Sequence, residues 1–354
     1  MKIVRETVNG IPLIRIADDT YHYAFDYYTT NKWLDEHRLV LSRSTHLLNG
    51  SFFSTCDVVL IDLEAETETV LIPNAIVRVV YGSKVYAIRH DDDLRTFVCL
   101  DTADNSLTEL QRDISLMDDS LLTADGRYFV YRMQSTPAVC KRLDIQTGEA
   151  VELFRKEFAP PFYIANHYMV NPHNPDQVFF AHEGDTRYVS NRLWLFEKDK
   201  GMRCIAKQRL DEEGNLGDCF GHECWAPDGK GLWFVKYSCS PTPPRGICYV
   251  TTEGEQTDVL YGKYPYWHVA CAPNNRYLVS DTQGPGYSSV VVVDKETGKE
   301  AEAYRAGFYR DHPAHPHPTF SPSSDQIIFH DLVGGENGQL TVGIMRVEDV
   351  LNQP

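Results

Sequence analysis

Four histidines of this chain stand at one position of a recurring pattern. Each lies three residues before a segment that starts with an apolar or aromatic residue, passes through a small polar turn and continues as a β-rich stretch: His167, His222, His268 and His317. The chain has only 13 histidines in 354 residues, so chance seldom places four in one register. Imidazole binds divalent transition metals and transfers protons near neutral pH. The alternative is a structural role, in which the rings pack and bond to the backbone.

A second signal is the segment 311–318, which reads Asp-His-Pro-Ala-His-Pro-His-Pro. In an extended segment His315 and His317 point to the same side, and the neighbouring prolines stiffen the backbone. Together with His268 these two side chains offer three nitrogen ligands, and His312 offers a fourth. We therefore predict a metal site made by His268, His312, His315 and His317.

His222 and Arg192 have different predicted roles. His222 shares the register of the other histidines but belongs to a unit further from the His-Pro-His segment, and a histidine beside a metal suits proton transfer. Arg192 lies one unit earlier, where a fixed guanidinium can hold a carboxylate through two hydrogen bonds. For Arg192 the alternative is a surface strand residue in a salt bridge. Tyr266, two residues before His268, belongs to an aromatic group that is expected to be partly core and partly channel wall, and an aromatic ring at the mouth of the channel can stack on a sugar ring.

The segments that must position these residues recur about every fifty residues. Clear copies start 48, 55, 46 and 49 residues apart, at Leu122, Val170, Trp225, Cys271 and Phe320. Weaker copies near Trp33 and Val80 bring the number of units to seven, and 354/7 is about 51 residues per unit.

Several units contain a second hairpin with glycine at the turn, such as those around Gly148, Gly254 and Gly298. Glycine supplies the positive φ that a tight hairpin needs. Two hairpins give four strands per unit, so the sequence predicts an all-β, seven-bladed β-propeller with four-stranded antiparallel blades. The innermost strands then bring the phased histidines to one channel. We expect residues 1–354 to form a single domain whose N-terminal strand (10–16) and C-terminal strand (340–347) share a blade.

Composition and charge exclude several classes of partner. The net charge is 34 − 50 = −16, whereas sequence-independent binding of nucleic acid or of anionic membranes needs clustered Lys and Arg. The longest purely aliphatic run, Val290–Val293, cannot span a bilayer. The N-terminus has no signal-peptide pattern and nine scattered cysteines fit reduced thiols, so we expect a cytoplasmic protein. A small anionic substrate stays compatible with this charge, because one local cationic site suffices.

The motifs of residues 165–330, taken together, resemble the oligogalacturonate lyases. The resemblance rests on four segments in order: His182-Glu-Gly, Arg192-Leu-Trp, the run Gly221-His-Glu-Cys-Trp-x-Pro-Asp-Gly, and His315-Pro-His-Pro-x-Phe-Ser-Pro. It implies a seven-bladed propeller and a cytoplasmic enzyme of pectin breakdown.

The resemblance also implies a manganese-type divalent ion held by three histidines and a glutamine. His268, His315 and His317 fall on the three histidine positions, and His312 falls on the glutamine position, so this chain departs from the family pattern there. The changed ligand leaves the identity of the metal open.

By the same resemblance, His222 matches the proposed base and Arg192 matches the catalytic arginine of the family. The implied reaction is β-elimination on a short uronate oligosaccharide of the digalacturonate type, a small anionic substrate. His222 would remove the C5 proton, Arg192 would neutralise charge and the metal would bind the uronate carboxylate.

Three further residues, His167, His182 and Tyr266, are expected to contact the substrate, although His167 matches no family residue. Two other functions stay open: a non-catalytic propeller that binds a glycan or a protein, and a metal-dependent propeller hydrolase or lactonase. The oligomeric state is not predicted.

Overall fold

The structure, a computed structural model, describes residues 1–47, 52, 55–91, 94–113, 116–308, 313–335 and 337–353. In this part of the chain almost all regular structure is β-strand, and α2 (Val347–Leu351) is a single short helix near the C-terminus. None of the helices in the described residues combines the length and the apolar composition that a bilayer crossing needs.

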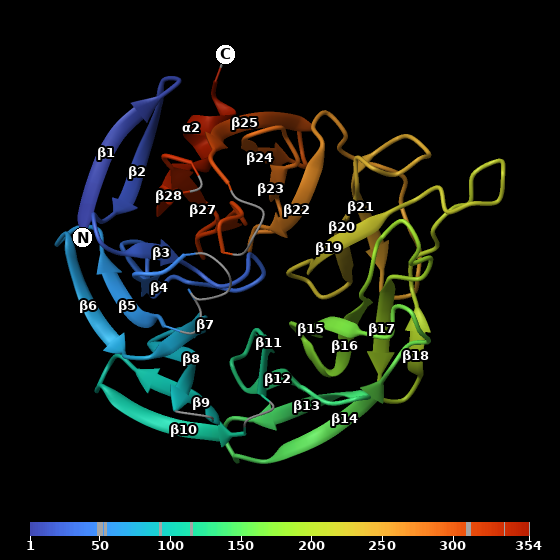
Figure 1. Ribbon diagram of the computed structural model, residues 1–354, viewed down its shortest axis with the longest axis horizontal. Coiled ribbons are helices and arrows are strands. Elements are labelled where there is room, and N and C mark those ends of the chain that lie inside the picture. Colours follow the sequence, from blue (N-terminus) through green and yellow to red (C-terminus); the bar gives the residue numbers. More distant parts are fainter. Residues whose placement is uncertain are drawn as a thin grey trace. The chain divides into compact units, whose positions relative to one another are not determined.

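The chain divides into two compact units. The first unit comprises Met1–Ile114 and Ala270–Pro354, and the second comprises Ser115–Val269. Within the described residues the strands form seven antiparallel sheets (Figure 1). This number agrees with the seven repeat units predicted from the sequence, and the all-β class is confirmed.

The first unit contains four sheets, and in each the strands are hydrogen-bonded to one another in the following order. One sheet consists of β1 (Lys2–Val8), β2 (Ile11–Ala17), β28 (Gln339–Arg346), β27 (Gln326–Val333) and β26 (Thr319–Phe320). The next consists of β3 (His22–Ala24), β4 (Arg38–Ser44), β5 (Asp57–Asp62) and β6 (Thr67–Ile72). The third consists of β10 (Ser106–Arg112), β9 (Leu94–Asp101), β8 (Lys84–Asp91) and β7 (Ala75–Tyr81). The fourth consists of β22 (Tyr266–Cys271), β23 (Tyr277–Thr282), β24 (Ser288–Asp294) and β25 (Lys299–Ala306).

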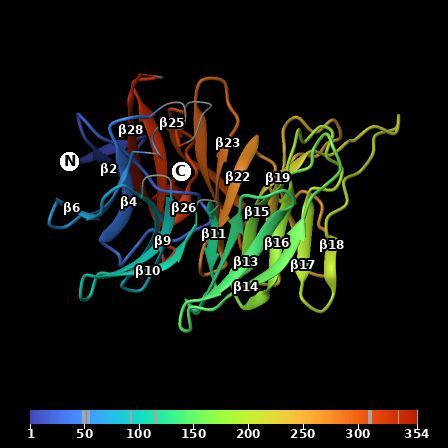
Figure 2. The same ribbon diagram turned by 60° about the horizontal axis from the view of Figure 1, so that its bottom comes forward.

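The second unit contains three sheets, and Figure 2 shows two of them, β11–β14 and β15–β18, beside each other. The first consists of β11 (Leu116–Leu122), β12 (Tyr128–Met133), β13 (Ala138–Asp144) and β14 (Ala150–Lys156). The second consists of β15 (Ala165–Asn171), β16 (Asn174–His182), β17 (Leu193–Glu197) and β18 (Gly201–Cys204). The third consists of β19 (Phe220–Trp225), β20 (Gly231–Lys236) and β21 (Gly246–Thr251).

Two of the seven sheets do not have the four strands that were predicted for each sequence repeat. The five-stranded sheet joins both ends of the chain, because β2 pairs with β28 in the register Ile14–Ile344. In the three-stranded sheet, the hairpin predicted around Gly254 makes only isolated bridges, Ile247–Tyr261 and Val250–Gln256, so the outer segment does not form a regular strand.

The other predicted hairpins form as expected. Gly148 and Gly298 adopt φ of 74° and 72°, and their N–H groups donate to the carbonyls of Asp144 and Asp294 at 2.8 Å. These turns connect β13 to β14 and β24 to β25. Because side chains at such φ are strained, glycine is the residue that lets each pair of strands turn back tightly.

Apolar faces hold neighbouring sheets together inside each unit. In the second unit, Phe179 and Leu195 from the β15–β18 sheet pack with Phe220, Leu232 and Phe234 from the β19–β21 sheet. Each such side chain contributes roughly 1.5–3 kcal/mol when it is fully buried. This packing fixes the first strands of the two sheets, β15 and β19, which carry His167 and His222.

Candidate active site

Two of the phased histidines occupy equivalent bulges on β15 and β19. The β15–β16 ladder shifts register between Asn166 and Met169, and the β19–β20 ladder shifts between Gly221 and Cys224. Inside these bulges His167 and His222 have φ of 53° and 50°. Left-handed backbone is uncommon for residues other than glycine, and bulges of this kind often redirect a side chain at a functional site. The register that His167 and His222 share in the sequence therefore corresponds to a shared backbone conformation.

The ring of His222 is held among neutral groups. Its Nδ1 lies 2.7 Å from the Tyr237 hydroxyl and 3.0 Å from the Trp267 carbonyl oxygen. The ring centroid lies 3.9 Å from that of His268. Burial, followed by the neighbouring His268 and Arg192, holds the pKa of His222 well below its usual value. The imidazole is thus neutral at physiological pH and able to accept a proton.

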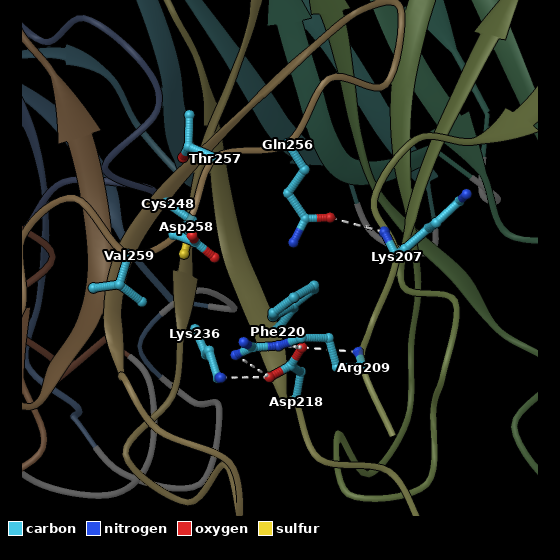
Figure 3. A pocket seen from close by; sticks show the side chains of 10 residues that line it. All are labelled: Lys207, Arg209, Asp218, Phe220, Lys236, Cys248, Gln256, Thr257, Asp258 and Val259. Carbon is cyan, nitrogen blue, oxygen red and sulfur yellow. Dashed lines mark hydrogen bonds and ion pairs between the residues drawn. The ribbon is translucent and has the colours of Figure 1, made fainter. Parts of the chain in front are cut away.

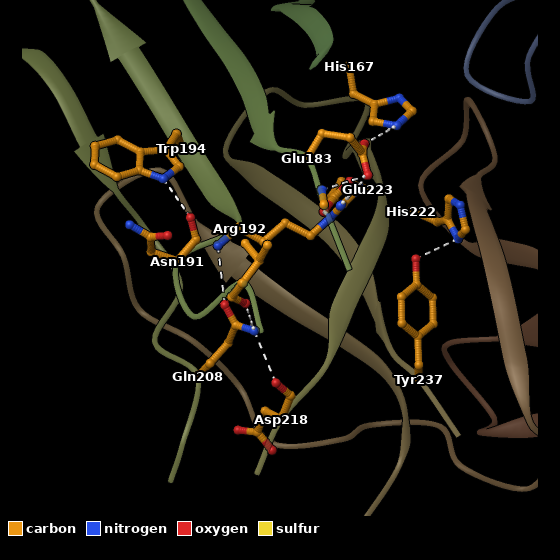
Figure 4. A network of polar contacts seen from close by, with 12 residues as sticks. His167, Glu183, Asn191, Arg192, Trp194, Gln208, Asp218, His222, Glu223 and Tyr237 are labelled. Atoms are coloured by element: carbon orange, nitrogen blue, oxygen red, sulfur yellow. Dashed lines mark hydrogen bonds and ion pairs between the residues drawn. The ribbon is translucent and has the colours of Figure 1, made fainter. Parts of the chain in front are cut away.

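Arg192 is buried in an ion-pair network, which Figure 4 shows. Its side chain is 3% exposed, and its Nε lies 2.8 Å from Glu223 Oε1 while its Nη1 lies 3.3 Å from Glu183 Oε1. The other oxygen of Glu183 lies 3.2 Å from Nε2 of His167. The guanidinium therefore forms salt bridges, as the alternative interpretation of Arg192 expected. It lies inside the protein, however, and not on the surface.

The charges of this network support one another. Burial alone would lower the pKa of Arg192, but the Glu223 and Glu183 carboxylates raise it well above its usual value. Burial alone would raise the pKa of Glu183, but the hydrogen bond from His167 and the charge of Arg192 lower it. At neutral pH the network therefore contains a guanidinium cation and a Glu183 carboxylate anion.

Sequence reasoning missed Glu183, Glu223 and Tyr237. Each glutamate directly follows a histidine that was singled out, in His182-Glu183 and His222-Glu223. That adjacency was the available signal, but pairing with Arg192 depends on residues 9 and 31 positions away.

We expect Glu223→Gln to destabilise the protein. Glu223 is 1% exposed, and removing one charge of a buried pair costs about 3 kcal/mol because the remaining charge stays desolvated. Urea denaturation at pH 7 measures this loss. Glu152→Gln, which removes the partner of the half-exposed Arg155, is the matched control and should leave the free energy of unfolding unchanged. An equal effect of the two substitutions would contradict the structural role of Glu223.

His268, His315 and His317 form a cluster of nitrogen ligands. The boundary between the two units falls inside β22, and this strand, which carries His268, belongs to the β22–β25 sheet. One ring nitrogen from each of the three histidines lies within 4.8 Å of the others, and all three side chains are buried. His312 lies outside the described residues.

Neighbouring groups position the His315–His317 segment. The backbone N–H of His317 donates to Asp281 Oδ2 at 3.2 Å, and the His315 carbonyl accepts from Nδ1 of His330 at 2.8 Å. His330 accepts the N–H of Phe25 at its Nε2, which fixes this tautomer. Burial lowers the pKa of His330 to about 3, so its ring stays neutral and serves as a hydrogen-bonding strut.

The chemistry of this cluster fits a divalent transition metal. Three imidazole nitrogens form a donor set that suits divalent transition metals such as iron, nickel, copper or zinc, whereas magnesium and calcium prefer oxygen ligands. His317 shares the left-handed backbone of His167 and His222, with φ of 43°. Strained backbone in a buried histidine cluster is typical of a functional site.

Two residues predicted to contact a substrate have mainly internal contacts. Nδ1 of His182 lies 2.7 Å from Asn191 Oδ1 and its Nε2 lies 2.6 Å from the Phe162 carbonyl, so both ring nitrogens are used within the protein. Its ring also stacks on Phe158 at 3.8 Å. Tyr266 is almost fully buried beside Tyr264. Substrate contact by His182 or Tyr266 stays a prediction. The internal hydrogen bonds of His182 and the burial of Tyr266 do not favour it.

A pocket of about 250 Å³ in the second unit contains none of the predicted site residues (Figure 3). It lies against the β19–β21 sheet, where Arg209 and Lys236 both form ion pairs with the buried Asp218. The Asp218 carbonyl accepts from Gln208, whose side-chain oxygen in turn accepts the N–H of Arg192. The pocket is thus a neighbour of the Arg192 network, and its lining holds both cationic and anionic side chains.

Comparison with known proteins relates the chain to one enzyme family. A family model described as oligogalacturonate lyase matches residues 107–304. The oligogalacturonide lyase of Pectobacterium atrosepticum is 27% identical over 216 residues, and the oligogalacturonate lyase of Dickeya dadantii is 25% identical over 214 residues. Each match covers 55% of this chain and 52% of the relative. The chain therefore spans about half the length of the curated relatives that it matches.

Solved structures establish the fold. The structure of an oligogalacturonate lyase in complex with manganese superposes with a TM-score of 0.77 at 18% identity, covering 98% of this chain and 96% of that one. The Vibrio parahaemolyticus oligogalacturonate lyase gives 0.73 at 18% identity, with 98% and 97% covered. The β-propeller domain of a Pyrococcus furiosus protease gives 0.54 at 10% identity, with 89% and 90% covered.

Together with the seven antiparallel sheets, these likenesses confirm the predicted seven-bladed β-propeller class. The family model spans more than half of the 354 residues and includes β19, β22 and the Arg192 network. The chain belongs to the oligogalacturonate lyase family.

Proposed function

We propose that this protein is a metal-dependent lyase that cleaves short oligogalacturonates, of the digalacturonate type, by β-elimination. The observation that carries the proposal is the contact between a neutral imidazole, His222, and His268, a member of the three-histidine cluster. A base beside a metal ligand is the arrangement that proton abstraction next to a carboxylate requires. Membership of the oligogalacturonate lyase family supports the class of substrate.

The difficulty of the reaction is the weak acidity of the C5 proton. This proton is α to a carboxylate, and its removal places further negative charge on a group that is already anionic. A divalent ion held by His268, His315 and His317, such as manganese, supplies Lewis-acid stabilisation of that charge when it is bound. His222 accepts the C5 proton, the electron pair of the C5–H bond forms the C4=C5 double bond, and the C4–O bond breaks. The released sugar oxygen takes up a proton from solvent, and a 4,5-unsaturated uronate results.

Arg192 is proposed to add positive charge next to the substrate carboxylate. Its two carboxylate partners differ in exposure, because the Glu183 side chain is 31% exposed and that of Glu223 is 1% exposed. A substrate carboxylate would therefore compete with Glu183, which His167 also holds, while Glu223 keeps the guanidinium in place. His167 thus acts in this proposal by holding Glu183 at the edge of the site.

The test is incubation of the 354-residue chain with di- and trigalacturonate in the presence of manganese. Elimination forms a conjugated unsaturated uronate, so we expect ultraviolet absorbance to rise in step with the loss of substrate. Oligosaccharides whose carboxylates have been reduced to alcohols are the matched control and should not react, because their C5 proton is not activated. Cleavage without absorbance would indicate a hydrolase, and binding without cleavage would indicate a non-catalytic propeller.

A further inference from the structure

Tyr237 approaches His222 through a space that only a glycine leaves open. Tyr237 directly follows β20, and its backbone N–H donates to the Cys219 carbonyl at 2.9 Å, so its ring lies over the start of β19. A Cβ atom on Gly221 would lie 1.9 Å from the Tyr237 hydroxyl oxygen. The Tyr237 and His222 rings meet edge to face, with centroids 5.4 Å apart. Gly221 and the bulge at His222 therefore create a fixed contact between the phenol and the imidazole.

The partners of Nδ1 determine which nitrogen of His222 is basic. A carbonyl oxygen can only accept a hydrogen bond, so the 3.0 Å contact with the Trp267 carbonyl requires a proton on Nδ1. The Tyr237 oxygen, 2.7 Å from the same nitrogen, then accepts the same N–H. Nε2 carries the lone pair in this tautomer and is the nitrogen available to a substrate proton.

The equivalent bulge on β15 offers an internal comparison. His167 has the same left-handed backbone as His222, but Figure 4 shows its ring facing the Glu183 carboxylate, at 3.2 Å. His167 thus faces a carboxylate, whereas the partners of His222 Nδ1 are a phenol and a backbone carbonyl, both neutral groups. The two bulges therefore present histidines with different chemistry, and Tyr237 is one source of the difference.

We infer that Tyr237 is a positioning residue: together with the Trp267 carbonyl it fixes the His222 ring so that Nε2 faces the substrate as the basic nitrogen. This inference rests on the proposed function, because it concerns the same reaction. It predicts that the Tyr237 hydroxyl affects the chemical step only through His222.

Tyr237→Phe is the direct test, because it removes the hydroxyl and keeps the ring. We expect kcat for digalacturonate to fall by about 10- to 100-fold while KM changes by less than about 2-fold, since a misaligned base slows proton abstraction without weakening ground-state binding. Tyr249→Phe, on β21 of the same sheet, removes a hydroxyl away from His222 and should keep the wild-type rate. An unchanged kcat in Tyr237→Phe would overturn the inference.

A double-variant cycle separates positioning from a structural role. In a His222→Asn background, Tyr237→Phe should have no further effect on the residual rate, because the base that it is inferred to position is gone. The same fold-loss in both backgrounds would show that Tyr237 acts elsewhere and would overturn the inference. Gly221→Ala, which displaces Tyr237 by sterics, is the second route if Tyr237→Phe does not fold, and its kcat should also fall at constant KM. A wild-type chain that forms no unsaturated product would instead reject the proposed function itself.

Discussion

Replacing His222 with asparagine is expected to lower kcat for short oligogalacturonates by about 1000-fold, within the range that a general base contributes. The neutral imidazole has no substitute in this variant, because asparagine cannot accept a proton near neutral pH. Asparagine is the substitution of choice, since it tolerates left-handed backbone and the φ of His222 is 50°. The bulge of β19 should therefore persist. The initial rate of ultraviolet-absorbing product, at saturating manganese and substrate, measures the loss.

The control for this substitution is His173→Asn, which changes an exposed histidine whose Nε2 contacts the Pro227 carbonyl. It should keep the wild-type rate. If His222→Asn also kept that rate, with a normal circular dichroism spectrum, His222 would not be the base. His167, at the equivalent bulge of β15, would then be the next residue to replace.

The repeat predicted the fold because each unit is one sheet with its own turns. The period, the turn glycines and the apolar runs are local features, and together they indicated seven antiparallel sheets. In the β19–β21 sheet the repeat predicted a fourth strand that does not form. The segment after Gly254 carries a hairpin signal, yet it meets β21 only at two isolated bridges, because tertiary contacts and not the turn decide whether an outer strand forms. The prediction of a single domain stays a prediction.

The phased histidines were found because they share one register, but their setting could not be read from the sequence. A register marks equivalent positions, and the structure adds that at His167, His222 and His317 the backbone is left-handed. Partners from other strands then decide what each ring does. Glu183 and Tyr237 belong to strands or loops whose approach depends on packing, so the sequence carried no signal that linked them to a particular histidine.

The ion pairs of Arg192 also could not be predicted from the sequence. Its residue type indicated either a carboxylate clamp or a salt bridge, and the structure places it in a buried salt bridge with Glu223 and Glu183. Burial changes what such a pair contributes to stability. A surface pair adds little to the free energy of unfolding, whereas removing one partner of a buried pair lowers it substantially. The approach of Glu183, which follows β16, and of Glu223 on β19, and not the local sequence, determines which case applies.

Removal of the metal is the second large effect that we expect. Dialysis of the wild-type chain against a chelator should lower the rate of elimination by about 1000-fold, and manganese should restore it, because charge on the substrate carboxylate is then no longer stabilised. His315→Ala should weaken manganese binding by at least about 100-fold, since it removes one of three ligands. Calorimetric titration of manganese into the chelator-treated chain measures the affinity without reference to activity.

Thermal unfolding distinguishes a metal site from a cluster of structural histidines. An ion that binds only the native state stabilises it by about 2.7 kcal/mol at 100 times its Kd, so manganese should raise the Tm of the wild type but not that of His315→Ala. The control His173→Asn should respond like the wild type. A wild-type Tm that is the same with manganese and with chelator would mean that His268, His315 and His317 pack together without binding an ion. The elimination mechanism would then lose the metal's stabilisation of the substrate carboxylate and keep only that of Arg192, which two glutamates share.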